Sequence, residues 1–227
     1  RSGIRCQVDP FQGGARRSAE LLVEGRLQPD LMLGGTSEIH ERLAAAEVSI
    51  PVDLPEDPGR ISRFDSASRR FTPSYLGYLA LVYRQLPDFQ RPPDWGALID
   101  SRWIDRVSLP SPASTSGGSV FLATQLLRQP DPERGWQYIA ILASAGVPWE
   151  SRSIDVITKI AAGEADLGVS WAQDAWRRRE RDRMPIEVII PTRTGYEVGA
   201  VSALRWARDS QAAQEFIRFL TSKEAQQ

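Results

Sequence analysis

Hydrophobic positions along the chain recur with two periods, separated by Gly, Pro and polar residues. Short apolar runs, such as residues 30–33 and 107–110, are typical of buried strands. Apolar residues spaced three and four apart, as in residues 210–220, are typical of amphipathic helices. The two patterns alternate, which predicts a largely parallel sheet covered by helices and therefore an α/β fold.

These patterns predict the following elements. Strands are expected at 4–8, 30–33, 75–84, 107–110, 165–170, 186–190 and 195–204. Helices are expected at 15–22, 36–43, 94–99, 119–128, near 133–145, at 153–162 and at 210–220. A further, basic helix is expected between the strands at 165–170 and 186–190 and extends through Arg183. Glycine pairs at 13–14 and 34–35 indicate turns between a strand and a helix, and Thr36 is an expected N-cap.

The chain length favours two intertwined lobes. At 227 residues, two lobes of about 100 residues each fit better than a string of modules. We expect residues 1–76 and 204–227 to form the first lobe and residues 77–203 the second. The long apolar strands near 76–84 and 195–204 would cross between them.

Composition excludes several kinds of partner and site. Lys plus Arg (28) nearly equals Asp plus Glu (29), so bulk charge indicates no nucleic-acid partner. One cysteine, Cys6, cannot form an internal disulfide, and with the single histidine, His40, it cannot build a Cys/His zinc site. No apolar run approaches the roughly 20 residues that span a bilayer. If the protein is exported, its targeting segment has been removed.

Three turns rich in Gly, Ser or Thr precede expected helices. They are residues 34–37, residues 114–118 and the helix start at 151–153. Free N–H groups and the positive end of a helix dipole suit a phosphate or carboxylate, and such loops lie at the strand ends where α/β sheets bind ligands. Simple capping by Ser and Thr is the alternative interpretation of each turn.

Carboxylates near two strand ends form a second candidate set. Trp171, Gln173 and Asp174 follow the strand that ends at Ser170, and Tyr196 and Glu197 lie in the second crossing strand. Carboxylates accept hydrogen bonds from hydroxyl groups, and an aromatic ring can cover a sugar, although salt bridges are the alternative. The basic run at 177–183 contains acids, which is typical of a solvated helix face, with a docking surface as the alternative.

Signatures of enzymes are absent from the sequence. It contains no Gly-x-Ser-x-Gly elbow, no Walker loop and no His-Glu-x-x-His. A catalytic triad would need His40, which we expect to be a surface or helix-face residue rather than a catalytic base. We therefore expect no catalytic residue, no metal and no cofactor. An α/β enzyme is the alternative. It would need a hydrolysis or transfer activity that substitution of Asp174 or Glu197 abolishes.

The order and spacing of several segments resemble a known family, the type II periplasmic solute-binding proteins of the ferric-iron and sugar-phosphate ABC-import branch. The resemblance covers nearly the whole chain and is carried by residues 30–36, 75–83, 94–103, 109–117, 162–170, 194–200 and 212–226. It implies a monomeric two-lobed periplasmic protein whose hinge closure buries a ligand. Its partner would be an ABC permease or a sensor.

Within that family, the resemblance also implies a class of ligand. Ferric-iron binders hold the metal with adjacent tyrosines, whereas this chain has Tyr196 followed by Glu197, as in hexose-phosphate binders. In the hexose-phosphate binders, a glutamate and a His-Asp pair hold the sugar hydroxyls. By resemblance, Glu197 corresponds to the glutamate, Asp174 to the aspartate and Gln173 to the histidine, which it replaces. A small phosphorylated sugar or other organophosphate is the expected ligand. The alternatives are ferric iron, or a role as the ligand-reading domain of a sensor.

The resemblance also implies a shortened first lobe. Residues 3–5 match the family's second strand, so the usual first strand and helix are missing, and the C-terminal portion stops early. The phosphate side is expected at Thr36, Ser37, Thr115, Ser116 and Ser153. All expected ligand contacts are Gly35, Thr36, Ser37, Ser114, Thr115, Ser116, Gly117, Ser153, Ser170, Trp171, Gln173, Asp174, Tyr196 and Glu197.

Overall fold

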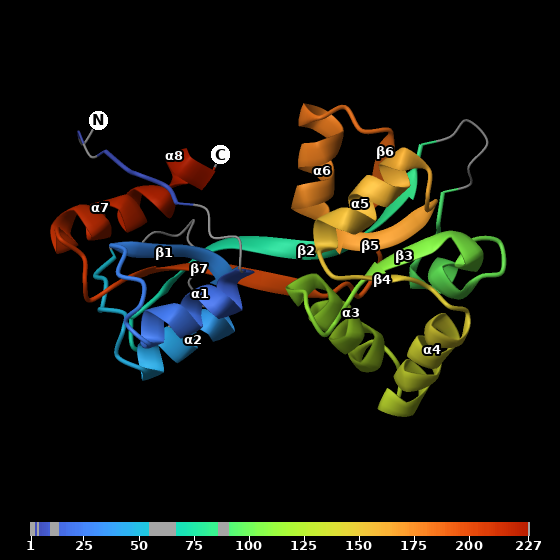
Figure 1. Ribbon diagram of the computed structural model, residues 1–227, viewed down its shortest axis with the longest axis horizontal. Helices are drawn as coiled ribbons and strands as arrows, with labels where there is room; N and C mark the ends of the chain where they lie inside the picture. The colour runs from blue at the N-terminus through green and yellow to red at the C-terminus, as the bar shows by residue number, and fades with distance from the viewer. Residues whose placement is uncertain (1–2, 4, 10–13, 55–66, 86–90, 227) are drawn as a thin grey trace. The chain divides into compact units, whose positions relative to one another are not determined.

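The computed structural model describes residues 3, 5–9, 14–54, 67–85 and 91–226 (Figure 1). The chain forms two compact units. Unit 1 contains Arg1–Leu76 and Glu197–Gln227, and unit 2 contains Gly77–Tyr196. Residues 197–203, which we expected in the second lobe, belong to unit 1 because strand β7 (Tyr196–Ala203) pairs there with strand β1 (Leu31–Thr36).

Unit 1 is built on the antiparallel pair of β1 and β7, together with the start of β2 (Thr72–Arg84). Helices α1 (Gly14–Val23) and α2 (Ser37–Ala45) pack on one face, where Leu22 and Leu43 meet Met32. Helix α7 (Ser210–Leu220) covers the other face, followed by α8 (Lys223–Gln226) (Figure 1). Adjacent residues of β1 therefore contribute to two separate apolar clusters, Met32 to the one under α1 and α2 and Leu31 to the one under α7, which also contains Val201 and Ala203 of β7.

The Gly34–Gly35 pair is not the turn that we expected, because both glycines lie inside β1. Their φ angles are 90° and 83°, a region that glycine adopts readily, and the register with β7 shifts between Leu33 and Thr36. This irregularity is a bulge. Thr36 stands at the N-cap position of α2 as expected, but its side chain makes no capping hydrogen bond.

The strand expected at residues 4–8 is not found in the described residues. Residues 5–8 are exposed and form no strand, while Ile4 lies outside the described residues. Alternation over five residues produces a strand only where a neighbouring strand supplies the ladder hydrogen bonds. His40, expected as a surface or helix-face residue, is fully buried on α2, so it is not a surface residue and lies on a buried face of that helix.

Unit 2 contains a sheet with the order β2-β5-β3-β4, in which β6 also pairs with β2. The strands are β3 (Val107–Pro110), β4 (Trp149–Glu150), β5 (Leu167–Trp171) and β6 (Ile186–Ile189). Strand β3 runs parallel to both β4 and β5, whereas β2 is antiparallel to β5 and β6.

Helices cover both faces of the unit 2 sheet (Figure 1). Helices α3 (Ser116–Leu127) and α4 (Pro132–Ser144) enclose the larger cluster, which includes Trp95, Phe121 and Trp171. Helices α5 (Ser153–Ala162) and α6 (Ala172–Arg181) cover the other face around Ile157. Short 3₁₀ helices at Trp95–Ile99 and Ile104–Arg106 precede β3. No helix in the described part of the chain is long and apolar enough to cross a membrane.

Candidate functional site

One edge of the unit 2 sheet gathers three helix N-termini. The parallel strands β3, β4 and β5 all end at this edge, and α3, α5 and α6 begin directly after them. The first N–H groups of each helix have no partner within the helix, and the helix dipole places partial positive charge there. The edge is therefore suited to an anion.

Three of the expected ligand contacts meet at this edge. A Cβ built on Gly117 would lie 3.1 Å from Oγ of Ser153 and 3.4 Å from Nε1 of Trp171. The first turn of α3 therefore approaches both the start of α5 and the indole of Trp171, and glycine at position 117 keeps this approach open. Nearby, the Ser114 hydroxyl donates to the Ser151 carbonyl at 3.1 Å, which ties the two loops together.

The neighbouring glycine, Gly118, lets α3 start against the end of β3. A Cβ at this position would overlap the backbone carbonyls of Pro110 and Ser111. Thr115 completes the junction, because its hydroxyl donates to the Ser111 carbonyl at 2.8 Å and accepts from the Gly118 N–H at 2.9 Å. The Thr115 hydroxyl is thus engaged in capping α3, as the simpler interpretation of this turn predicts, while Ser116 is exposed.

Ser170 differs from the other hydroxyl residues of this edge. Its side chain is only 1% exposed, and Oγ has no hydrogen-bond partner among the described residues. On the same face of β5, Gly168 lies against Val156 and Ile160 of α5, so Ser170 lies on the α5 side of the sheet. A buried hydroxyl without a partner costs free energy, which an arriving acceptor would recover.

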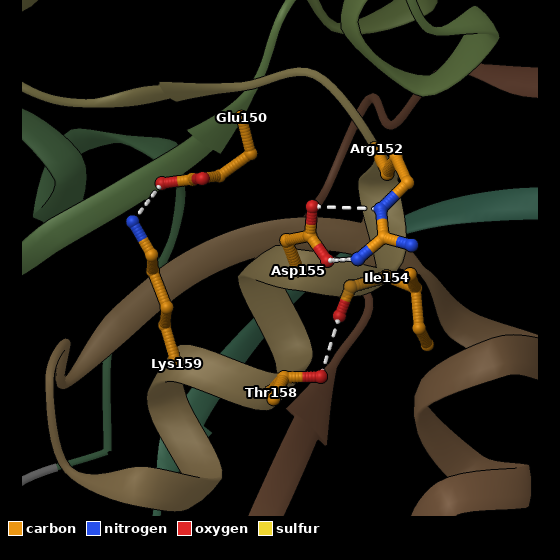
Figure 2. Close-up of polar contacts among 6 residues, drawn as sticks. All are labelled: Glu150, Arg152, Ile154, Asp155, Thr158 and Lys159. Carbon is orange, nitrogen blue, oxygen red and sulfur yellow. Dashed lines mark hydrogen bonds and ion pairs between the residues drawn. The ribbon is translucent and has the colours of Figure 1, made fainter.

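Two ion pairs shape the start of α5 (Figure 2). The Arg152 guanidinium binds the Asp155 carboxylate through two hydrogen bonds of 3.0 and 2.6 Å, which lowers the pKa of Asp155. Glu150, at the end of β4, accepts from Lys159 at 2.7 Å and from the buried Ser108 hydroxyl at 3.1 Å. These contacts anchor the segment that carries Ser153.

The first turn of α6 carries the remaining polar candidates of unit 2, Gln173 and Asp174, which are both partly buried. Desolvation by burial raises the pKa of Asp174, although the positive charges of Arg177 and Arg178 oppose the shift. The contact to Arg177 is long, at 3.9 Å. A partly buried carboxylate with a raised pKa is a candidate for a ligand-binding position.

Unit 1 holds the other expected contacts in two places. Gly35, Thr36 and Ser37 join the bulge of β1 to α2, and all three are partly buried. Glu197 lies at the start of β7 with 9% exposure, and the Tyr75 hydroxyl donates to its Oε1 at 3.4 Å. Tyr75 lies on β2, far from Glu197 in sequence, so this contact depends on strand pairing.

Tyr196 belongs to unit 2 and is half exposed. Its ring centroid lies 6.3 Å from that of Tyr78, with the rings tilted by 50°. The sequence did not indicate Tyr75 or Tyr78 as site residues, because aromatic residues in an apolar strand leave no local signal. Gly118 and Arg152 were part of two of the predicted turns but not of the expected ligand contacts. Among the described residues, no group of three or more His, Cys, Asp or Glu side chains could hold a metal ion.

Comparison with known proteins identifies the family. The sequence profile described as "Bacterial extracellular solute-binding protein" matches residues 1–227. The chain belongs to this family. A curated relative, an uncharacterised protein of Haemophilus influenzae, is 26% identical over 210 residues, which are 88% of this chain and 60% of the relative. The chain thus spans less than two thirds of that relative.

Solved structures confirm the type II periplasmic-binding fold. The periplasmic binding protein P5PA matches with a TM-score of 0.76 at 22% identity, covering 95% of this chain and 71% of that one. AfuA from Actinobacillus pleuropneumoniae, with exogenous fructose-6-phosphate bound, gives 0.74 at 21%, covering 94% and 70%. Iron-bound HitA from Pseudomonas aeruginosa gives 0.73 at 17%, covering 94% and 72%. At these identities the structures show the fold, and their ligands differ.

Proposed function

We propose that this solute-binding protein captures a small phosphorylated sugar or a related organophosphate outside the cytoplasm and works with the membrane permease of an ABC importer. The observation that carries the proposal is the unpartnered Ser170 hydroxyl at a sheet edge where three helices begin. Hydroxyl and backbone donors without acceptors match the oxygens of a phosphate group. The indole N–H of Trp171, beside Gly117 and Ser153, adds a further donor.

Carboxylates support a hydroxyl-bearing ligand. Asp174 and Glu197 accept hydrogen bonds, which sugar hydroxyls supply. Tyr196 is followed by Glu197, whereas the resemblance to the family implies a second tyrosine at this position in iron binders. Among the similar structures, AfuA holds fructose-6-phosphate, which makes that compound the natural first probe.

Isothermal titration of the whole chain tests this proposal. Fructose 6-phosphate should bind, inorganic phosphate should bind more weakly, and fructose should not bind measurably, because each part of the ligand supplies only some of the contacts. Ser170→Ala should weaken fructose 6-phosphate binding about tenfold, as loss of one buried hydrogen bond to a charged group predicts. Thr158→Ala is the control, since Thr158 is exposed and its hydroxyl donates to the Ile154 carbonyl one turn earlier in α5 (Figure 2).

Iron is the second candidate, favoured by the similarity to iron-bound HitA. Ferric citrate belongs in the same titration series for this reason. Binding of ferric iron without binding of any phosphorylated compound would overturn the organophosphate proposal.

A further inference from the structure

The ring of Tyr75 lies directly against the backbone of Gly199. A Cβ placed on Gly199 would overlap Cε1 and Cζ of that ring, so a side chain at this position would displace the ring. Gly199 lies on β7, and Ser74, the neighbour of Tyr75 on β2, donates its hydroxyl to the Gly199 carbonyl at 3.3 Å. Strands β2 and β7 are therefore hydrogen-bonded beside the contact between the Tyr75 ring and Gly199.

The position of the ring determines what its hydroxyl can reach. Oη of Tyr75 donates to Oε1 of Glu197, two residues before Gly199 on the same strand. The donor–acceptor distance of 3.4 Å is long, so a small displacement of the ring breaks the contact. Glu197 is 9% exposed, which leaves its carboxylate little freedom to find water instead.

We propose that Tyr75 is a positioning residue that aims the Glu197 carboxylate at a ligand hydroxyl, and that Gly199 is required because it leaves room for the Tyr75 ring. This inference rests on the proposed function, in which Glu197 binds the sugar part of the ligand. A carboxylate held in place discriminates between a ligand that offers a hydroxyl and one that does not. Tyr75 thereby contributes to selection of a hydroxyl-bearing phosphate over bare phosphate.

Substitutions of the two residues in contact, Tyr75 and Gly199, test the positioning of Glu197. Tyr75→Phe removes the hydroxyl and keeps the ring, while Gly199→Ala keeps the hydroxyl and displaces the ring. Each should weaken fructose 6-phosphate binding about fivefold, the size expected for one hydrogen bond, and leave binding of inorganic phosphate unchanged. Equal loss for both ligands, or no loss for either, would overturn the proposed selectivity.

Matched controls separate this effect from general damage. Tyr83→Phe makes the same change elsewhere on β2, and Gly96→Ala adds a Cβ where no atom lies within 4 Å. Both should bind fructose 6-phosphate as the unmodified chain does. Melting temperatures of all four variants identify any that are poorly folded.

A measurement without ligand keeps the two proposals distinguishable. The carboxyl ¹³C resonance of Glu197, assigned by its loss in Glu197→Gln, should shift in Tyr75→Phe and Gly199→Ala and stay in place in the controls. An unmoved resonance would overturn the positioning role itself. Failure of the unmodified chain to bind fructose 6-phosphate would instead overturn the proposed function.

Discussion

The buried imidazole of His40 lies 2.7 Å, Nδ1 to Oγ, from the hydroxyl of Ser202. Its other nitrogen, Nε2, lies 2.9 Å from the carbonyl oxygen of Gly34 in the β1 bulge. Because a carbonyl only accepts, Nε2 carries the proton and Nδ1 accepts from Ser202. One neutral side chain of α2 therefore contacts both β1 and β7.

This arrangement predicts sensitivity to acid. Burial lowers the pKa of His40 below its usual value of about 6.5. The unfolded chain then takes up a proton first, so this contribution to stability is complete above about pH 6.5 and is lost as the pH falls toward the folded-state pKa. Between pH 7 and pH 5, the melting temperature should fall more steeply for the unmodified chain than for His40→Gln, which cannot titrate. Parallel profiles would contradict the prediction.

Two buried serines should respond differently to the same substitution. The Ser108 hydroxyl donates to Glu150, whereas the Ser170 hydroxyl has no partner among the described residues. Ser108→Ala should cost about 1 to 2 kcal/mol in the free energy of unfolding, and Ser170→Ala should be neutral or stabilising by up to about 1 kcal/mol. Urea unfolding of both variants in the absence of ligand measures the contrast. A large loss in Ser170→Ala would show that its hydroxyl has a structural role.

The start of α3 should not tolerate a side chain at Gly118. The added Cβ meets rigid backbone at Pro110 and Ser111, so the helix must move away from β3. Gly118→Ala should therefore reduce the free energy of unfolding by about 2 kcal/mol or more. Gly96→Ala, where the new Cβ meets open space, should change it by less than about 0.5 kcal/mol. Similar losses in both variants would contradict the close approach at Gly118.

Substitution of Asp174 should affect stability and ligand binding in opposite directions. Its pKa is raised, chiefly by burial, so its ionisation destabilises the folded chain at neutral pH, and this cost disappears as the pH falls through the folded-state pKa. Asp174→Asn should raise the melting temperature at pH 7 by about 1 to 2 °C, a small effect because the side chain is partly exposed. The gain should vanish near pH 4. The same variant should weaken binding of fructose 6-phosphate. If its higher melting temperature persisted at pH 4, the ionisation of Asp174 would not be the cause of the higher stability.

Several helices in both units follow from local pattern. The apolar spacing of residues 153–162 and 210–220 predicted α5 and α7 with the bounds that the structure shows, since amphipathic periodicity is a property of each segment alone. Thr115 likewise caps α3 through contacts within a few residues. Strand β4 was missed because two residues carry no period and form a strand only through pairing with β3.

The sequence by itself determined the alternation of strands and helices, the turns that precede α3 and α5, and the family. Only the tertiary structure decided which of those turns meet, because the contacts of Gly117 with Ser153 and Trp171 join segments far apart in the chain. The burial of His40, the bulge at Gly34 and the contact of Tyr75 with Glu197 were also decided there. Each depends on the register between strands, and register is set by long-range packing that no local stretch of sequence encodes.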